Sequence, residues 1–390
     1  MSEDKLERHT ARPLRLIGRF LRRSWQGLLV AVLAIALGIA AYLSPGLVEA
    51  DVRLDEGNVY AINRGDELLG TVNSQIKQLS NAAPIGDQRS EVLQSGDTVL
   101  LLLPQSSSLV AFDAARNITA SPTKLPPNAG VQLVGETLLV YRPESGAIWS
   151  GDLKKMLALD FDKEKPEFEI GEGGIATLTA DGDVIGLDPG RSALVRHDGD
   201  QETLTQLPFE LETDSVLELS AVGNKAFVLD RTSRRIMVEG MDQAFPVSEA
   251  ASAELMEPAP SALGGEDGAR AIFANTAGLN RVTTDGLESV SGRIDHAPVA
   301  PVQVGDCVYG AGVSGTEGTF VKKCRGQDPI RVPIESITSD GSAIDFQVNR
   351  GVVALNDLSN GTLWMVDKDM FIIHPEDWRN IVPEDKKEDD

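Results

Sequence analysis

A pair of adjacent β-rich runs recurs about every 42 residues through most of the chain, and this period constrains the fold more than any other feature. In each unit an apolar run ends in a turn residue, and a second run follows after a few polar residues. The first runs end at residues 63, 103, 142, 188, 230, 275, 312 and 356. Repeats of this length stack so that each unit buries its apolar surface against the next.

Further short strands flank this pair of runs. One precedes the pair at 131–134 and 216–219, and another follows it at 168–170 and 371–373. Four short strands in about 40–45 residues are typical of a propeller blade. The 37 Gly and 20 Pro agree with a turn-rich β-protein. We therefore predict an all-β fold, a β-propeller of eight four-stranded blades, with seven blades as the near alternative.

Closure into a ring is favoured because one four-stranded sheet cannot bury both of its faces alone. No helix-period pattern of ten or more residues follows Val48, which disfavours an α/β fold. A stack of β-sandwiches remains the other alternative, since short and evenly spaced strands are common to both folds. The sixth unit is the weakest, because residues 255–261 form a Pro-rich segment that we interpret as a long loop.

The N-terminal region has the pattern of a membrane anchor. Residues 1–26 contain seven Lys or Arg against three Asp or Glu, and no charged residue lies between Gly27 and Val48. This uncharged stretch would span roughly 33 Å as a helix, enough to cross a hydrocarbon core of about 30 Å. The basic flank predicts a cytoplasmic N-terminus and a single-pass protein whose remaining chain is extracytoplasmic. A cleaved signal peptide ending near Ala50 is the alternative.

The basic residues before the predicted span have a regular spacing. Several of them recur at intervals of four and three residues, while Leu14, Ile17 and Leu21 take another face. This pattern predicts an amphipathic helix on the anionic lipid of the cytoplasmic membrane, although the charges would serve equally well only to set the topology. The predicted membrane-surface residues are Arg8, Arg12, Arg15, Arg19, Arg22 and Arg23.

The chain has two cysteines, Cys307 and Cys324, at the outer ends of a predicted hairpin. An extracytoplasmic compartment permits a disulfide, and the symmetric placement favours a bond between the two strands. Two free buried thiols are the alternative. Metal binding is disfavoured because no histidine lies nearby.

No catalytic or cofactor motif is recognisable in the sequence. The four histidines are scattered, and the chain contains no nucleophile elbow, phosphate-binding loop or dinucleotide fingerprint. Asp and Glu number 59, so paired carboxylates carry no information about glycosidase chemistry. The formal net charge of −23 disfavours a nucleic-acid partner. We predict no catalytic residue, no metal and no cofactor.

The chain resembles the N-terminal part of large actinobacterial envelope proteins that carry fibronectin type III or Ig-like repeats. The resemblance rests on the single span after a basic N-terminus and on the segments 59–63, 70–76, 307–311, 321–326 and 361–367 with Asp377-Trp378. It implies a membrane-anchored envelope protein that continues, in the family, into fibronectin-like repeats. The segments are structural and imply no catalytic role.

We therefore expect a cytoplasmic basic segment (1–26), a transmembrane helix (27–48), an extracytoplasmic propeller (51–378) and an acidic disordered tail (379–390). The expected function is that of a non-enzymatic scaffold in the cell membrane that binds an envelope protein or a glycan. One alternative is a polysaccharide hydrolase or lyase on a propeller scaffold. Another is a structural stalk base that spaces distal repeats from the membrane.

Overall fold

The computed structural model describes residues 57–113, 116, 118–198, 201–212, 214–258, 270–337, 343–366 and 370–381. The described residues belong to one compact unit, residues 56–390. The predicted basic segment, the predicted span and the six arginines before it lie outside these ranges, as do residues 382–390. Within the described part of the chain, no helix has the length and apolar character needed to span a bilayer.

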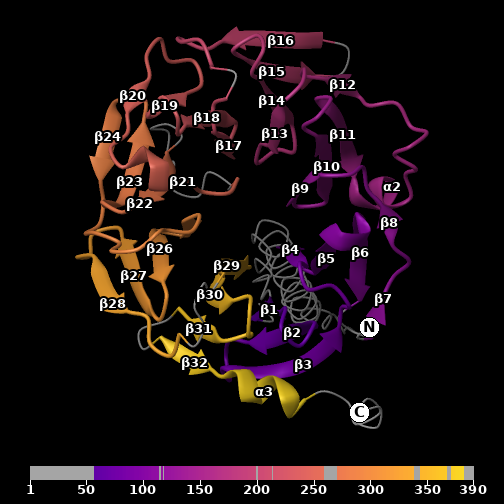
Figure 1. Ribbon diagram of the computed structural model, residues 1–390, viewed down its shortest axis with the longest axis vertical. Helices are drawn as coiled ribbons and strands as arrows, with labels where there is room; N and C mark the ends of the chain where they lie inside the picture. Colours follow the sequence, from indigo (N-terminus) through magenta and orange to yellow (C-terminus); the bar gives the residue numbers. More distant parts are fainter. Residues whose placement is uncertain are drawn as a thin grey trace, which may run out of the picture. The chain divides into compact units, whose positions relative to one another are not determined.

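Eight antiparallel sheets follow one another along the chain and surround a common axis (Figure 1). The first four sheets contain the strands β1 (Asn58–Asn63), β2 (Leu68–Asn73), β3 (Gln78–Pro84); β4 (Glu91–Ser95), β5 (Thr98–Leu103), β6 (Ser108–Asp113), β7 (Ile118–Thr119), β8 (Thr123–Lys124); β9 (Gly130–Val134), β10 (Thr137–Arg142), β11 (Ala147–Asp152), β12 (Phe168–Glu169); and β13 (Ile175–Leu178), β14 (Val184–Asp188), β15 (Ala193–Asp198), β16 (Gln201–Gln206).

The other four sheets each have four strands in chain order. They contain β17 (Leu217–Val222), β18 (Lys225–Asp230), β19 (Arg235–Val238), β20 (Phe245–Pro246); β21 (Glu254–Leu255), β22 (Ala271–Asn275), β23 (Gly278–Thr283), β24 (Gly286–Ser289); β25 (Val302–Val304), β26 (Cys307–Ser314), β27 (Glu317–Cys324), β28 (Ile330–Pro333); and β29 (Ile344–Asn349), β30 (Val352–Asp357), β31 (Leu363–Met365), β32 (Phe371–Ile373).

The fold is an eight-bladed β-propeller, as the repeat predicts, and each sheet is one blade, numbered in chain order. From blade 2 to blade 6 the innermost strand of each blade contacts that of the next, in the series β4, β9, β13, β17 and β21. The ring closes where β1 of blade 1 contacts β29 and β30 of blade 8. In blades 2 to 8 the predicted first runs are the second strands, and the predicted preceding strands are the innermost ones.

Apolar faces of neighbouring blades pack against each other to form the core. Tyr60 and Ile62 of blade 1, for example, share one buried cluster with Leu101 and Val110 of blade 2. Side chains alternate between the two faces of a strand, so one strand supplies apolar residues to both adjoining interfaces. This explains why the second strands are almost continuously apolar and buried, as in β14 and β18.

A buried polar residue ends the second strand in several blades and forms the next turn. The side chains of Asn63, Asp188 and Asp230 each accept a hydrogen bond from the backbone N–H three residues further on, at 3.0, 2.9 and 2.9 Å. Short acceptor side chains of this kind satisfy the turn backbone locally. The Asn or Asp that punctuates the sequence repeat is therefore a turn residue.

The predicted disulfide between Cys307 and Cys324 is present. The two residues are direct partners across β26 and β27, with Cα atoms 4.0 Å apart. A cross-strand pair outside the hydrogen-bonded positions brings Cα atoms this close. The bond therefore joins the two central strands of blade 7.

A short C-terminal helix, α3 (Pro375–Arg379), packs on β3 of blade 1 (Figure 1). Its Trp378 is fully buried among residues of blades 1 and 8, and its indole N–H donates to the carbonyl of Gly361 at 2.8 Å. Ile381 packs against the same cluster. The helix therefore joins the last blade to the first at the outer side of the ring.

Candidate binding site on the propeller axis

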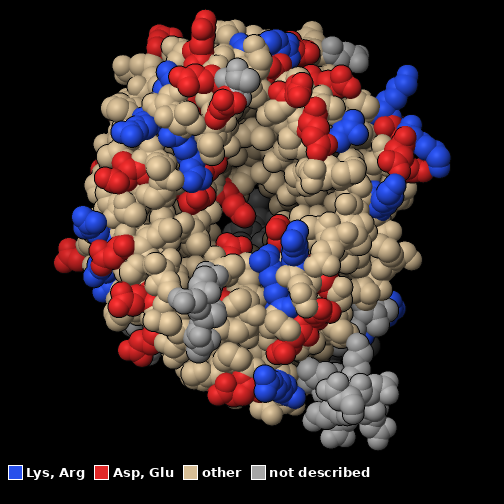
Figure 2. All heavy atoms as spheres, viewed as in Figure 1, with Lys and Arg blue, Asp and Glu red and all other residues tan. Residues whose placement is uncertain are grey.

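A cavity of about 560 Å³ lies among the innermost strands, and Figure 2 shows a hollow at the centre of the face that it draws. Six blades contribute to its wall. The lining residues are Val92–Ser95, Val131–Gly135, Ala180, Met256–Pro258, Pro301–Gln303 and Asp345–Val348. A concave site with apolar walls and a few polar groups is the usual form of a ligand pocket in a protein.

The polar side chains in this wall are amides, carboxylates and the hydroxyl of Ser95. Gln94, Gln132, Gln303 and Gln347 supply four amides, and Glu257 and Asp345 supply two carboxylates. Most of the amides bond to neighbouring blades. Gln132 accepts from the Leu178 N–H at 3.0 Å, and Gln94 donates to the Gln347 side chain at 3.0 Å. The carboxylates are therefore the groups best able to recognise a ligand.

The strand register places four carboxylates at the same level of the ring. In blades 2, 5, 6 and 8, the residue opposite the second-last position of the second strand is acidic. The pairs are Glu91 with Leu102, Glu218 with Leu229, Glu254 with Ala274 and Asp345 with Asn356. An inner-strand residue at this position lies near the end of the axis where the turns after the second strands gather. We call these four residues and Glu257 the axial carboxylates.

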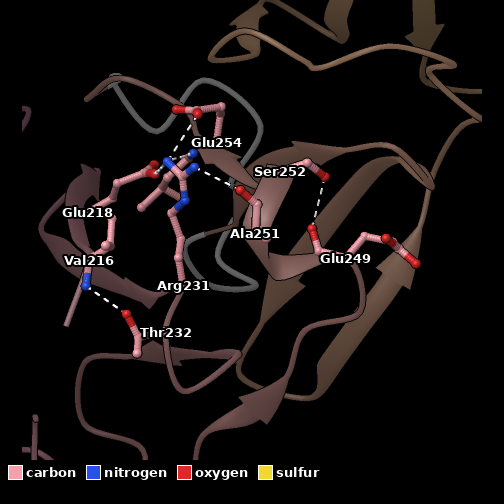
Figure 3. Close-up of polar contacts among 9 residues, drawn as sticks. Val216, Glu218, Arg231, Thr232, Glu249, Ala251, Ser252 and Glu254 are labelled. Atoms are coloured by element: carbon pink, nitrogen blue, oxygen red, sulfur yellow. Dashed lines mark hydrogen bonds and ion pairs between the residues drawn. The ribbon is translucent and has the colours of Figure 1, made fainter. Parts of the chain in front are cut away.

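Arg231 lies between two axial carboxylates of neighbouring blades (Figure 3). Its guanidinium is 3.0 Å from Glu218 and 3.1 Å from Glu254, and it also donates to the Ala251 carbonyl at 2.9 Å. Glu218 further accepts from the Leu255 N–H at 2.7 Å. Burial raises the pKa of both glutamates, and the neighbouring Glu254 adds to the effect on Glu218. One guanidinium group thus forms ion pairs with two carboxylates.

Arg64 occupies the corresponding position in blade 1, directly after the turn-forming Asn63. Its guanidinium donates to the Ser90 carbonyl at 3.1 Å, next to Glu91 of blade 2. Its charge opposes the rise in pKa that burial gives to the Glu91 carboxyl. Arg64 and Arg231 are therefore equivalent basic residues, each set beside the axial carboxylate of the following blade.

The carboxylates repel one another across the axis. Enclosure among the blades raises the pKa of Glu257, and the charge of Glu91 raises it further. Burial, followed by the charge of Glu257, raises the pKa of Asp345 to about 7. Glu91, Glu257 and Asp345 thus repel one another, so a positively charged ligand group in the cavity would relieve this repulsion.

Sequence reasoning missed this site. The sequence predicts a loop over 255–261, but Leu255 belongs to the innermost strand of blade 6 and Met256 extends it, because the Met256 N–H donates to the Ile272 carbonyl at 3.0 Å. The strand register is needed to see that four of the carboxylates share one level. The sequence alone cannot distinguish them from the other acidic residues, since Asp and Glu number 59. The disulfide residues lie outside the cavity lining, and no group of His, Cys, Asp or Glu in the described ranges is arranged to hold a metal ion.

Comparison with solved structures agrees with the fold. The dihydro-heme d1 dehydrogenase NirN, in complex with DHE, has a TM-score of 0.55 and 11% identity, over 82% of this chain and 72% of that chain. BamB from Moraxella catarrhalis has a TM-score of 0.48 and 12% identity, over 80% and 92%. NirN is a β-propeller, and at 11% identity its likeness to this chain concerns the fold alone. No protein-family model and no curated protein matches the chain.

Proposed function

We propose that this chain is a non-enzymatic, membrane-anchored binding module whose propeller lies outside the cytoplasmic membrane. Its ligand is an envelope protein that inserts a basic side chain into the axial cavity. One observation carries the proposal: the described residues in the wall of the cavity of about 560 Å³ include two carboxylates, Glu257 and Asp345, and no Lys or Arg, and burial together with the charge of the nearby Glu91 raises the pKa of both. Anchoring and the extracytoplasmic location rest on the uncharged stretch 27–48 and its basic flank.

A basic protein group suits this cavity better than a neutral glycan. Gln94, Gln132 and Gln347 already bond to neighbouring blades, which leaves few amides free for sugar hydroxyls. The lining also contains apolar residues such as Val131, Val302 and Phe346, which match the methylene stem of a lysine. The carboxylates then meet the ammonium group at the end of that stem.

The test is calorimetric titration of the detergent-solubilised full chain with a short lysine-containing peptide. We expect binding at pH 8 and 50 mM NaCl that weakens with added salt, since charge pairing contributes to it. The Glu257→Gln and Asp345→Asn variants should each lose about tenfold in affinity, the effect of roughly one charge-assisted hydrogen bond. Affinity should fall from pH 8 to pH 6, because Asp345 must release its proton to pair with the ligand.

The same peptide with acetylated lysines is the ligand control, and Glu288→Gln on the exposed strand β24 is the protein control. Equal binding of the acetylated peptide would contradict the proposal. Binding of a neutral oligosaccharide instead would favour the glycan-binding alternative, and cleavage of a polysaccharide would favour the hydrolase or lyase. An equal loss of binding in Glu257→Gln, Asp345→Asn and the control Glu288→Gln would mean that the peptide does not bind in the cavity.

A further inference from the structure

Blade 1 differs from the other seven blades in its innermost part. Its strand β1 corresponds to the second strand of each other blade, since Asn63 at its end forms the same turn as Asp188 and Asp230. In the other blades this second strand pairs with an innermost strand on the axial side. Among the described residues, β1 pairs only with β2, so blade 1 has three strands.

Side-chain amides occupy the inner edge of β1. The groups on this edge belong to Asn58, Tyr60 and Ile62. The Tyr60 N–H donates to Gln94 Oε1 at 2.9 Å, and Gln94 Nε2 donates back to the Tyr60 carbonyl at 3.1 Å. A primary amide has the same donor and acceptor as a peptide group. Gln94 therefore pairs with Tyr60 as a residue of a neighbouring strand would.

Two asparagines of blade 8 bond two further backbone groups of this edge. Asn349 Nδ2 donates to the Asn58 carbonyl at 3.1 Å, and the Ile62 N–H donates to Asn356 Oδ1 at 2.8 Å. Both asparagine side chains are buried. Buried backbone groups of a strand need partners, and here the neighbouring blades supply them.

The same amides also tie blade 8 to blade 2 across the inner face of blade 1. Gln94 of β4 donates to Gln347 of β29 at 3.0 Å. Asn349 accepts from the Gly96 N–H and donates to the Gly96 carbonyl, each at 3.0 Å. Gln94 and Gln347 belong to the wall of the axial cavity. The contacts that hold blade 1 therefore also shape the cavity.

We propose that Gln94, Asn349 and Asn356 form an amide clasp that replaces the innermost strand of blade 1, and that the ring opens at this blade first. The clasp makes four hydrogen bonds to β1 through three separate side chains. Each side chain loses rotamer freedom when the clasp is closed and regains it on opening. The inner edge of β1 is held by these side chains, whereas the inner edge of the second strand in every other blade is held by a paired backbone strand.

Amide hydrogen exchange on the full chain in detergent tests this proposal. In the unmodified protein, β1, β2 and β3 should exchange together and faster than the second and third strands of blades 4, 5 and 6. The Gln94→Met and Asn356→Leu variants, which keep side-chain size and remove hydrogen bonding, should speed exchange at Tyr60 and Ile62 respectively at least tenfold. They should leave blades 4 to 6 unchanged.

Gln132→Met is the matched control. Gln132 bonds to the Leu178 N–H between blades 3 and 4, both of which have their own innermost strands. This variant should speed exchange only near Leu178. The proposal is overturned if all eight blades exchange at one rate, or if the clasp variants leave β1 to β3 as protected as before. The exchange pattern of the unmodified protein decides the question even where a variant fails to fold, and it needs no ligand.

Discussion

At the scale of single residues, the axial carboxylates show how the strand register brings acidic residues that are distant in sequence to one level of the propeller. Glu91, Glu218, Glu254 and Asp345 are far apart in the sequence, and each is simply one residue of a short strand. Antiparallel pairing with the second strand fixes their height along the axis. The sequence predicts the strands, but it does not predict that these side chains share one level, because the pairing partners must be known residue by residue.

Asp345 gives a pH-dependent prediction. Its pKa in the folded protein is about 7, above the ordinary value of 3.8, so the folded state favours the protonated form. Stability from this group is complete below the ordinary pKa and is lost as pH rises through the folded pKa. The Asp345→Asn variant cannot ionise, so it should unfold with a free energy on the order of 2 kcal/mol higher than the unmodified protein at pH 8.

Urea unfolding at a series of pH values measures this difference, which should shrink as the pH falls from 8 towards 4. Asp242→Asn, at an exposed position, is the control and should show no such trend. A gain in stability that is the same at every pH would rule out the titration of Asp345 as its cause.

At the scale of elements, α3 shows how a five-residue helix acts through one side chain. Trp378 fits against Gly70 and Gly361, where a Cβ on either glycine would lie 2.7 to 2.8 Å from the indole ring. Because the two glycines have no side chain, they leave the space that the indole ring fills. In the sequence, Asp377-Trp378 stands out only through the resemblance to a family. Its packing could not be predicted, because the glycines that contact the indole come from blades 1 and 8.

Trp378→Ala should lower the free energy of unfolding by about 3–5 kcal/mol, since it empties a fully buried site between blades 1 and 8. Gly70→Ala should cost about 1–3 kcal/mol because its methyl group meets the indole. In the double variant the methyl group occupies the emptied space, so the two costs should not add. Denaturant unfolding of the four proteins gives the coupling, and simple additivity would mean that the two residues do not meet.

At the scale of the whole molecule, the period of the sequence was enough to predict an eight-bladed propeller. Each blade repeats one apolar second strand, so its recurrence survives even where the flanking strands are only two residues long, as in β12 and β20. Two departures from the regular blade could not be predicted from this recurrence. Neither the three-stranded blade 1 nor the innermost strand at Leu255 follows from hydrophobic pattern, because polar residues from other blades satisfy their backbones.

The membrane anchor is a prediction at this same scale. If residues 27–48 span the bilayer, the full chain should sediment with membranes and stay there through alkaline carbonate washing, because about 22 apolar or uncharged residues bind far more firmly than a surface charge contact. A variant with Arg in place of Leu33 and Leu37 should be released. Retention of that variant would contradict the predicted span, and a shortened mature chain would favour the signal-peptide alternative.

Each blade is built from one uninterrupted stretch of chain, and within the described residues no strand of the last blade pairs with the first sheet. Here the first and last blades meet through side chains, through Trp378 and through two backbone hydrogen bonds outside the sheets, from the Arg64 and Gly65 N–H groups to the Leu358 and Ser359 carbonyls. Duplication or loss of one blade-length segment of DNA would therefore leave the strand pairing of every remaining sheet intact.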